Sequence, residues 1–168
     1  MKAIADFFDS VSEYSGRATS LIIFALLFVV LYEVAARKIF NAPTVWAFDL
    51  SYMLYATMFL LGGAYTLKHR QHVAIDIITT MFSKKTQAII SLVAYLVFFF
   101  PFVLVFIYVT GNFALQAWDN LETSQSPWGQ PLYHFKTLMP LGFTLLLFQG
   151  ISEFIKDVII IKREGDRK

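Results

Sequence analysis

The sequence predicts an all-α integral membrane protein with four transmembrane helices, and three observations support this fold class. Hydrophobic residues make up 57% of the 168 residues and charged residues only 15%, compared with about a quarter charged in soluble domains. Four apolar stretches, at residues 18–40, 46–67, 86–112 and 137–161, each approach the roughly 20 residues that a helix needs to cross a bilayer. Together they occupy most of the chain, which predicts a single membrane domain over residues 1–168.

A short amphipathic segment precedes the first span in residues 1–15, where Phe7, Phe8 and Val11 lie among acidic residues. We expect this segment to lie at the cytoplasmic membrane interface. It has no basic head followed by an apolar core and a small-residue cleavage site, so a cleavable signal peptide is not expected.

A tight turn is predicted between the first two spans, because residues 41–44 (Asn-Ala-Pro-Thr) form a cluster of helix breakers. Near the end of the second span, Gly62 and Gly63 lack side chains and therefore let another helix come close. We interpret them as a packing site, either within this chain or with a partner.

The third span is unusually long. Residues 86–118 carry no charge, and a helix through all of them would exceed the thickness of the bilayer core. We expect this helix to tilt or to emerge from the membrane, and we expect Pro101 to kink it. An outward loop is predicted at residues 113–136, where Pro127 and Trp128 favour a defined turn at the membrane interface.

A short interfacial helix is predicted between the second and third spans, at residues 72–85. At 100° per residue, His72 and Asp76 share one narrow polar face, whereas aliphatic residues cover the other face. Such a helix lies flat on the membrane, with Lys84 and Lys85 placed at phospholipid headgroups.

The distribution of Lys and Arg predicts that both termini are cytoplasmic. In a four-span layout eleven of these residues lie on the side of the termini and three on the other side, and cytoplasmic segments carry the excess of positive charge. The three exceptions are Arg37, Lys38 and Lys136. Because Arg37 and Lys38 go against the rule, we expect a specific interaction to hold them.

Glu33 and Arg37 form the polar corner at the end of the first span. Their spacing of four residues, with the acid first, favours a pair on one helix face, and Asn41 continues that face. An alternative bridge joins Arg37 to Asp49, which opens the second span across the turn. Both interpretations make the corner structural, since a charge near hydrocarbon costs about 2.5–3.5 kcal/mol and needs a partner.

Composition argues against several classes of function. The chain has no cysteine, which excludes disulfides, thiolate catalysis and iron–sulfur clusters. No histidine lies inside a span, so a bis-histidine haem is not expected, and His69 and His72 lack the further ligands of a metal site. No nucleophile–base pair is visible by spacing, and a net charge of +2 does not suggest nucleic acid. We therefore expect no enzyme activity, cofactor or metal.

Transport by this chain alone is a second hypothesis. The spans are apolar at mid-depth and their charges gather at the ends, whereas a transport site is expected near the middle of the membrane. Glu33 is the only acid deep enough to bind a proton or cation. The alternative to an accessory role is therefore a self-contained oligomeric small-molecule transporter or exporter coupled through Glu33.

Two runs of residues carry a resemblance to a known family. The first run consists of Tyr32, Glu33, Val34, Arg37, Phe40, Asn41, Pro43, Trp46 and Asp49, and the second of Leu60, Gly62, Gly63, Ala64, Tyr65, Lys68, His72, Val73, Ile75 and Asp76. In this order and spacing they resemble the small membrane subunit (DctQ-like) of the tripartite ATP-independent periplasmic (TRAP) transporters. Two positions depart from the family pattern, since Asp49 stands where glutamate is expected and Lys38 where an aromatic residue is common.

The resemblance implies an inner-membrane protein of a bacterium or archaeon that pairs with a large elevator-type permease subunit (DctM-like). The large subunit would hold the substrate and sodium sites, and a periplasmic binding protein would deliver an organic acid such as a carboxylate or sulfonate. The small subunit would scaffold this sodium-driven symport, in which ATP is not used.

The residues expected to act at a subunit interface or in a structural role are Glu33, Arg37, Asn41, Trp46, Asp49, Gly62, Gly63, Lys68, His72 and Asp76. Those expected at the lipid interface are Lys84, Lys85 and Trp128.

Overall fold

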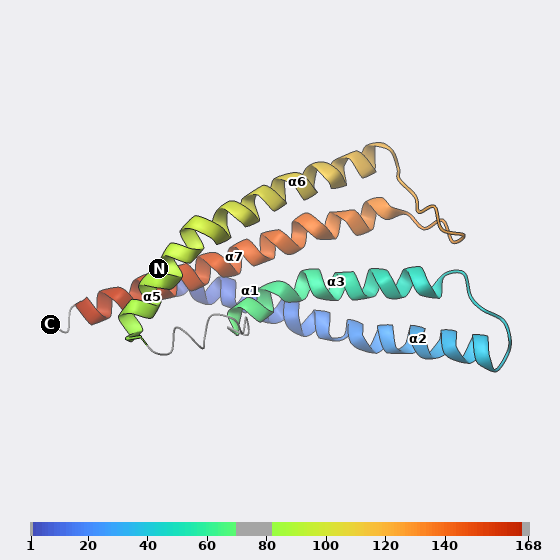
Figure 1. Ribbon diagram of the computed structural model, residues 1–168, viewed down its shortest axis with the longest axis horizontal. Coiled ribbons are helices and arrows are strands. Elements are labelled where there is room, and N and C mark those ends of the chain that lie inside the picture. Colours follow the sequence, from blue (N-terminus) through green and yellow to red (C-terminus); the bar gives the residue numbers. More distant parts are fainter. Residues whose placement is uncertain (1, 70–81, 166–168) are drawn as a thin grey trace.

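The computed structural model describes the chain apart from residues 1, 70–81 and 166–168, and it is built from helices (Figure 1). In chain order the elements are α1 (Lys2–Ser20), α2 (Ile22–Lys38), α3 (Ala47–Lys68), α5 (Lys84–Ala94), the π-helical turn η1 (Tyr95–Phe99), α6 (Phe100–Asp119) and α7 (Leu132–Gly165). The one β-type pairing among the described residues is a single bridge between Thr123 and Pro131.

Four helical stretches within the described part of the chain are long and apolar enough to cross a membrane. They are Lys2–Lys38, Ala47–Lys68, Lys84–Asp119 and Leu132–Arg163. The predicted all-α membrane fold with four spans is therefore confirmed.

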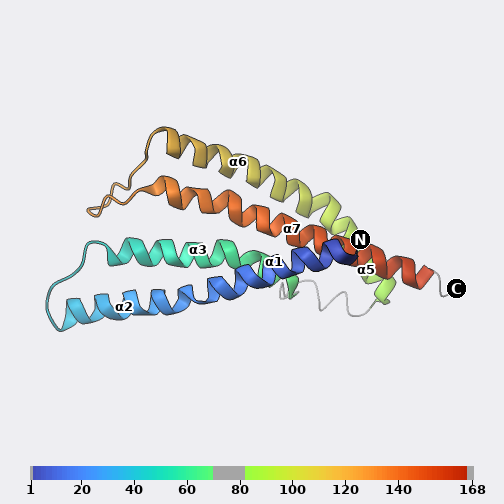
Figure 2. The same ribbon diagram turned by 180° about the vertical axis from the view of Figure 1, so that it is seen from behind.

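The long helices lie side by side in the order α2, α3, α7 and α6, and α1 packs against both α3 and α7 (Figures 1 and 2). One end of the molecule, which we call the terminal end, contains the first residues of α1, the start of α5 and the end of α7. The α2–α3 and α6–α7 loops lie at the opposite end, which we call the loop end (Figure 1). Helices α2 and α6 thus form the two edges of the layer.

The N-terminal segment forms a longer helix than expected and belongs to the bundle. α1 continues into α2 with Leu21 alone between them. Ala5, Ser12 and Thr19, each seven residues apart, are its buried side chains. Such small side chains allow the axes of neighbouring helices to approach closely, which explains why α1 packs on α3 and α7.

An irregular turn interrupts the third span where the sequence places Pro101. The Phe100 amide bonds to the Tyr95 carbonyl, five residues back, so η1 is one turn of π-helix. Pro101 has no N–H to offer the carbonyl of Val97, four residues earlier. A single π-type turn accommodates the missing hydrogen bond, and the helix continues beyond it.

The α6–α7 loop is shorter than the predicted range of residues 113–136. Helix α6 continues to Asp119 and α7 begins at Leu132, which leaves residues 120–131 between them. Residues 113–118 are uncharged, and this stretch contains no glycine or proline that would end a helix. The helix therefore continues to Asp119. Leu121 and Gly129 take positive φ values of 45° and 65°, which lets this short loop turn back.

The predicted interfacial helix cannot extend to Lys85. Ser83 has an extended backbone (φ −60°, ψ 153°), and its Oγ accepts the Thr86 amide at 3.3 Å. Serine is a favoured N-cap because its side chain satisfies a free amide of the first turn, so Lys84 and Lys85 open α5 instead. The rest of the predicted helix, with His72 and Asp76, lies outside the described residues.

Candidate functional site

Helix α1 is joined to α7 at the terminal end through Asp9. Its Oδ1 accepts hydrogen bonds from Ser152 Oγ at 2.6 Å, Lys156 Nζ at 2.8 Å and Gln149 Nε2 at 3.0 Å. These three partners follow one another at spacings of three and four residues, so they share one face of α7. The Asp9 carboxylate therefore binds three side chains on one face of α7.

A second carboxylate, Glu153, lies beside this contact. It is 3% exposed and accepts hydrogen bonds from Lys156 Nζ at 2.6 Å and Gln149 Nε2 at 3.1 Å. The Lys156 ammonium thus lies between Glu153 and Asp9. A buried charge is tolerated when it is paired and hydrogen-bonded, and the three side chains meet that condition together.

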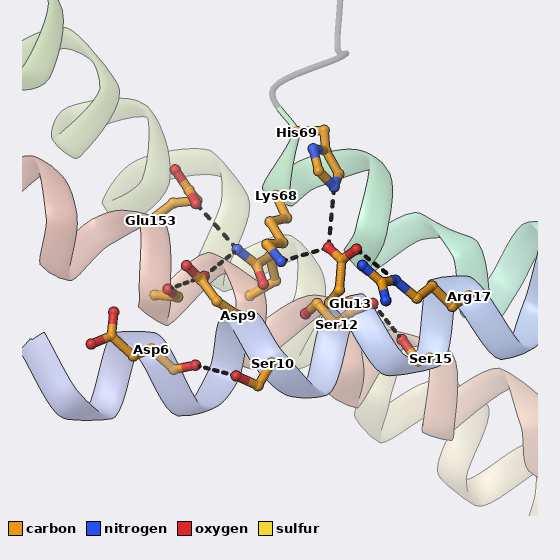
Figure 3. A network of polar contacts seen from close by, with 12 residues as sticks. Asp6, Asp9, Ser10, Ser12, Glu13, Ser15, Arg17, Lys68, His69 and Glu153 are labelled. Atoms are coloured by element: carbon orange, nitrogen blue, oxygen red, sulfur yellow. Dashed lines mark hydrogen bonds and ion pairs between the residues drawn. The ribbon is translucent and has the colours of Figure 1, made fainter.

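Glu13, one turn after Asp9, joins α1 to α3 (Figure 3). Lys68 Nζ donates to its Oε2 at 2.6 Å, and His69 Nε2 lies 3.4 Å from the same oxygen. Arg17 Nε donates to Oε1 at 3.0 Å from the next turn of α1. The last turn of α3 is thereby fastened to the middle of α1.

These polar residues form what we call the terminal-end network: Asp9, Glu13, Arg17, Lys68, His69, Gln149, Ser152, Glu153 and Lys156. A surface hollow of about 300 Å³ beside it is lined by Asp9, Glu13, Arg17 and Lys68, among others. These charges are already paired with one another, and their contacts connect α1 to α3 and to α7. We therefore interpret the network as structural.

Only Lys68 of this network was predicted as a site residue. The missed signal lies in the last span, where Gln149, Ser152, Glu153 and Lys156 recur at helical spacing on one face. A polar face on a helix of this length needs a polar partner. Asp9 is that partner, but the amphipathic pattern of residues 1–15 predicts a segment at the membrane interface instead.

At the loop end, Glu33 closes the α2–α3 hairpin. Arg37 Nε donates to its Oε1 at 3.0 Å, as the spacing of four residues predicts. The backbone amide of Thr44 donates to Oε2 at 3.1 Å, and the Thr44 hydroxyl donates to the same oxygen. Both carboxylate oxygens of Glu33 are therefore occupied by groups of its own chain.

The other predicted corner residues lie in the α2–α3 loop and at the start of α3. Asn41 lies in the loop with φ 49°, a conformation that asparagine tolerates better than most residues. The Trp46 ring stacks on Tyr32 with 5.6 Å between centroids. Asp49 lies in the first turn of α3, and its Oδ2 is buried without a hydrogen bond among the described residues. Arg37 pairs with Glu33, so of the two proposed pairings the structure contains the one within α2.

The α6–α7 loop is held by Lys136, which is 8% exposed. Its ammonium pairs with the Glu122 carboxylate and lies 3.8 Å from the centroid of the Phe113 ring. Trp118 Nε1 donates to Thr137 Oγ1 at 2.9 Å and adds a second tie between the two helices. Trp128 is 39% exposed at the tip of this loop.

The closest helix contacts fall at glycines other than the predicted pair. A Cβ at Gly62 would meet nothing within 4 Å, and one at Gly63 would lie 4.0 Å from Leu146 Cδ1. A Cβ at Gly142 would instead lie 2.9 Å from the Leu60 carbonyl oxygen, and one at Gly16 would lie 2.3 Å from Tyr65 Cδ2. Gly62 and Gly63 therefore do not mark a tight contact within the part of the chain that the structure describes.

Among the described residues, no three His, Cys, Asp or Glu side chains gather as metal ligands. The polar clusters at both ends connect helices and loops to one another, and the helices between them are largely apolar. This arrangement defines the class: a multi-pass membrane protein whose described polar clusters serve assembly of the helices.

The chain belongs to the DctQ family, the DctQ component of the tripartite ATP-independent periplasmic transporters, whose family model matches residues 26–159. This is a family of transport components and not of enzymes. One relative, the sialic acid TRAP transporter permease protein SiaT of Haemophilus influenzae (strain 86-028NP), is 24% identical over 81 residues. These residues are 48% of this chain and 13% of the relative, so the match spans a small part of that protein.

Proposed function

We propose that this chain is the small subunit that scaffolds a large elevator-type permease subunit. The complex would take up an organic acid, a carboxylate or sulfonate, with sodium as the driving ion and a periplasmic protein delivering the substrate. Membership of the DctQ family is the observation that carries this proposal.

The placement of charges in the described residues supports an accessory role. The paired acids Asp9, Glu13 and Glu153 lie at the terminal end, and Glu33 and Glu122 lie at the loop end. A substrate or ion site would need polar groups near mid-membrane. A static scaffold needs only helices that are firmly joined at their ends.

The occupied oxygens of Glu33 also favour a brace over a coupling site. A carboxylate that carries protons or cations through a transport cycle must release its partners, whereas Glu33 is bonded to Arg37 and to the loop residue Thr44. We therefore place Glu33 in the structural corner of the hairpin.

We propose that the terminal end faces the cytoplasm, because most Lys and Arg residues lie on that side. Gly62 and Gly63 are proposed to pack against a helix of the large subunit, and the open space beside Gly62 supports this. His72 and Asp76 are proposed to contact that subunit as well, and Lys84, Lys85 and Trp128 to lie at lipid headgroups.

The test is purification from native membranes through a tag on this chain. We expect a large polytopic subunit to copurify, and we expect deletion of the chain to abolish sodium-dependent uptake of radiolabelled carboxylates and sulfonates in the presence of the binding protein. A chain that purifies alone, and whose loss leaves uptake intact, would contradict the proposal.

Reconstitution of the chain alone is the matched control. We expect no flux from these vesicles with either a sodium or a proton gradient. Flux that disappears in Glu33→Gln would instead support a self-contained transporter.

A further inference from the structure

Helix α6 forms one edge of the helical layer (Figure 1). Its outward face is not wholly apolar. Ala114 is buried and belongs to the inward face, along which α6 packs on α7. Asn112 and Gln116 are each two positions from Ala114, so at 100° per residue they lie about 160° around the helix from it. Both carboxamides therefore lie on the outward face, where Gln116 is exposed and Asn112 is half-buried.

Neither carboxamide donates or accepts a side-chain hydrogen bond within the described residues. Threonines in the spans behave differently, because their hydroxyls donate to a carbonyl one turn earlier in the same helix. Examples are Thr57 to Met53, Thr66 to Gly62, Thr110 to Phe106 and Thr144 to Pro140. A carboxamide has two donors and an acceptor, and those of Asn112 and Gln116 are left open.

The position of Asn112 makes this exposure costly in lipid. Asn112 lies seven residues before the last residue of α6, Asp119, which is about 10 Å along the helix axis. If Asp119 marks the membrane surface, the Asn112 carboxamide lies in hydrocarbon, where nothing satisfies it. Polar side chains at such depth usually hydrogen-bond across to another helix.

The same face is hollowed. Tyr108, Val109, Asn112, Phe113 and Gln116 line a shallow depression of about 370 Å³ together with Thr110. The opposite edge of the molecule offers a contrast, because Phe24, Leu27 and Phe28 of α2 expose a wholly apolar surface that suits lipid tails.

We propose that this face of α6, lined by Tyr108, Asn112 and Gln116, binds a transmembrane helix of the large subunit that presents a hydrogen-bonding side chain to the two carboxamides. The inference rests on the proposed function, which supplies that subunit. We favour a larger partner over a second copy of this chain. The segment that matches this chain makes up 13% of the relative SiaT, so in that protein it is joined to a much longer stretch of polypeptide.

The first test is photo-crosslinking in the complex purified from native membranes. A photoreactive phenylalanine analogue replaces Tyr108 or, as the matched control, Phe28, since these side chains are 72% and 69% exposed on opposite edges. We expect an adduct of this chain with the large subunit from position 108 and none from position 28.

The second test measures dissociation of the purified complex for the double variant Asn112→Leu, Gln116→Leu. Interhelical hydrogen bonds in membranes average about 0.6 kcal/mol each, and about 1.4 kcal/mol is tenfold, so loss of two should weaken association about sevenfold. The control Thr57→Val, Thr144→Val removes two hydroxyls that bond within their own helices and should leave association unchanged.

Three results would overturn the inference. They are a dissociation constant unchanged in the leucine variant, an adduct from position 28 but not from position 108, and an adduct of twice the mass of this chain. If the unsubstituted chain recovers no large subunit, the proposed function fails and the inference falls with it. If it recovers the subunit and the leucine variant does so equally well, the inference alone fails.

Discussion

The Asp9 carboxylate and the Lys156 ammonium join the first and last helices of the chain, with Oδ2 and Nζ 2.7 Å apart. The two residues are 147 positions apart in the sequence. Because Lys156 also binds Glu153, the contact lies in a network that closes the bundle at its terminal end.

Asp9→Asn is expected to lower the midpoint of thermal unfolding in detergent. The change removes the charge opposite Lys156, and hydrogen bonds to charged groups contribute about 1.5–3 kcal/mol. Asp6→Asn is the control, since Asp6 is an exposed acid on the same helix. Equal midpoints for the two variants would show that the contact does not stabilise the bundle.

A double variant checks the same contact by another route. Asp9→Leu with Lys156→Met should unfold at a lower temperature than Asp9→Leu alone. In the single variant Lys156 keeps its contact with Glu153, whereas the double variant takes this cation away from a carboxylate that is 3% exposed. Removing one partner of a buried ion pair is strongly destabilising, so a higher unfolding temperature for the double variant would contradict the network.

Gly142→Ala is expected to destabilise the chain by about 1–3 kcal/mol, the usual cost of overpacking. The new Cβ would lie 2.9 Å from the Leu60 carbonyl oxygen, which belongs to backbone and cannot move aside easily. Gly62→Ala is the matched control on α3, where a Cβ meets nothing within 4 Å. The measurement is thermal unfolding of the isolated chain, and a control that is the less stable of the two would contradict the packing assignment.

Glu33→Ala is expected to speed hydrogen exchange at the Thr44 amide, which donates to Glu33 Oε2 at 3.1 Å. Arg37→Ala should have a smaller effect, because Oε2 keeps its contacts with Thr44 when the Arg37 contact to Oε1 is lost. Lys38→Ala serves as the control, as an exposed residue of the same turn. Exchange at Thr44 that is alike in all three variants would rule out Glu33 as the brace of the hairpin.

Lys136→Met is expected to loosen the loop at residues 120–131, because it removes the cation that pairs with Glu122. Methionine keeps much of the length and packing of the lysine stem, so the lost charge is the main change. Cleavage by chymotrypsin next to the exposed Trp128 should become faster. A cleavage rate equal to that of the unsubstituted chain would assign the order of the loop to the Trp118–Thr137 contact instead.

The local features of the chain were predictable from sequence. The Glu33–Arg37 pair follows from a spacing of four residues, and the irregular turn before Pro101 follows from the missing amide of proline. Each depends on residues within about one helical turn of one another, so the helical period alone brings them together.

The all-α membrane class, the four spans and the resemblance to the DctQ family follow from the amino-acid sequence, because hydropathy and local spacing are properties of neighbouring residues. The contacts of Asp9 with Lys156 and of Glu13 with Lys68, and the close approach at Gly142 rather than Gly62, emerge only when the helices are packed. Hydropathy marks a helix as membrane-spanning but does not specify its neighbours or its rotation. Those are set by how small side chains and paired charges fit once all the helices are packed together.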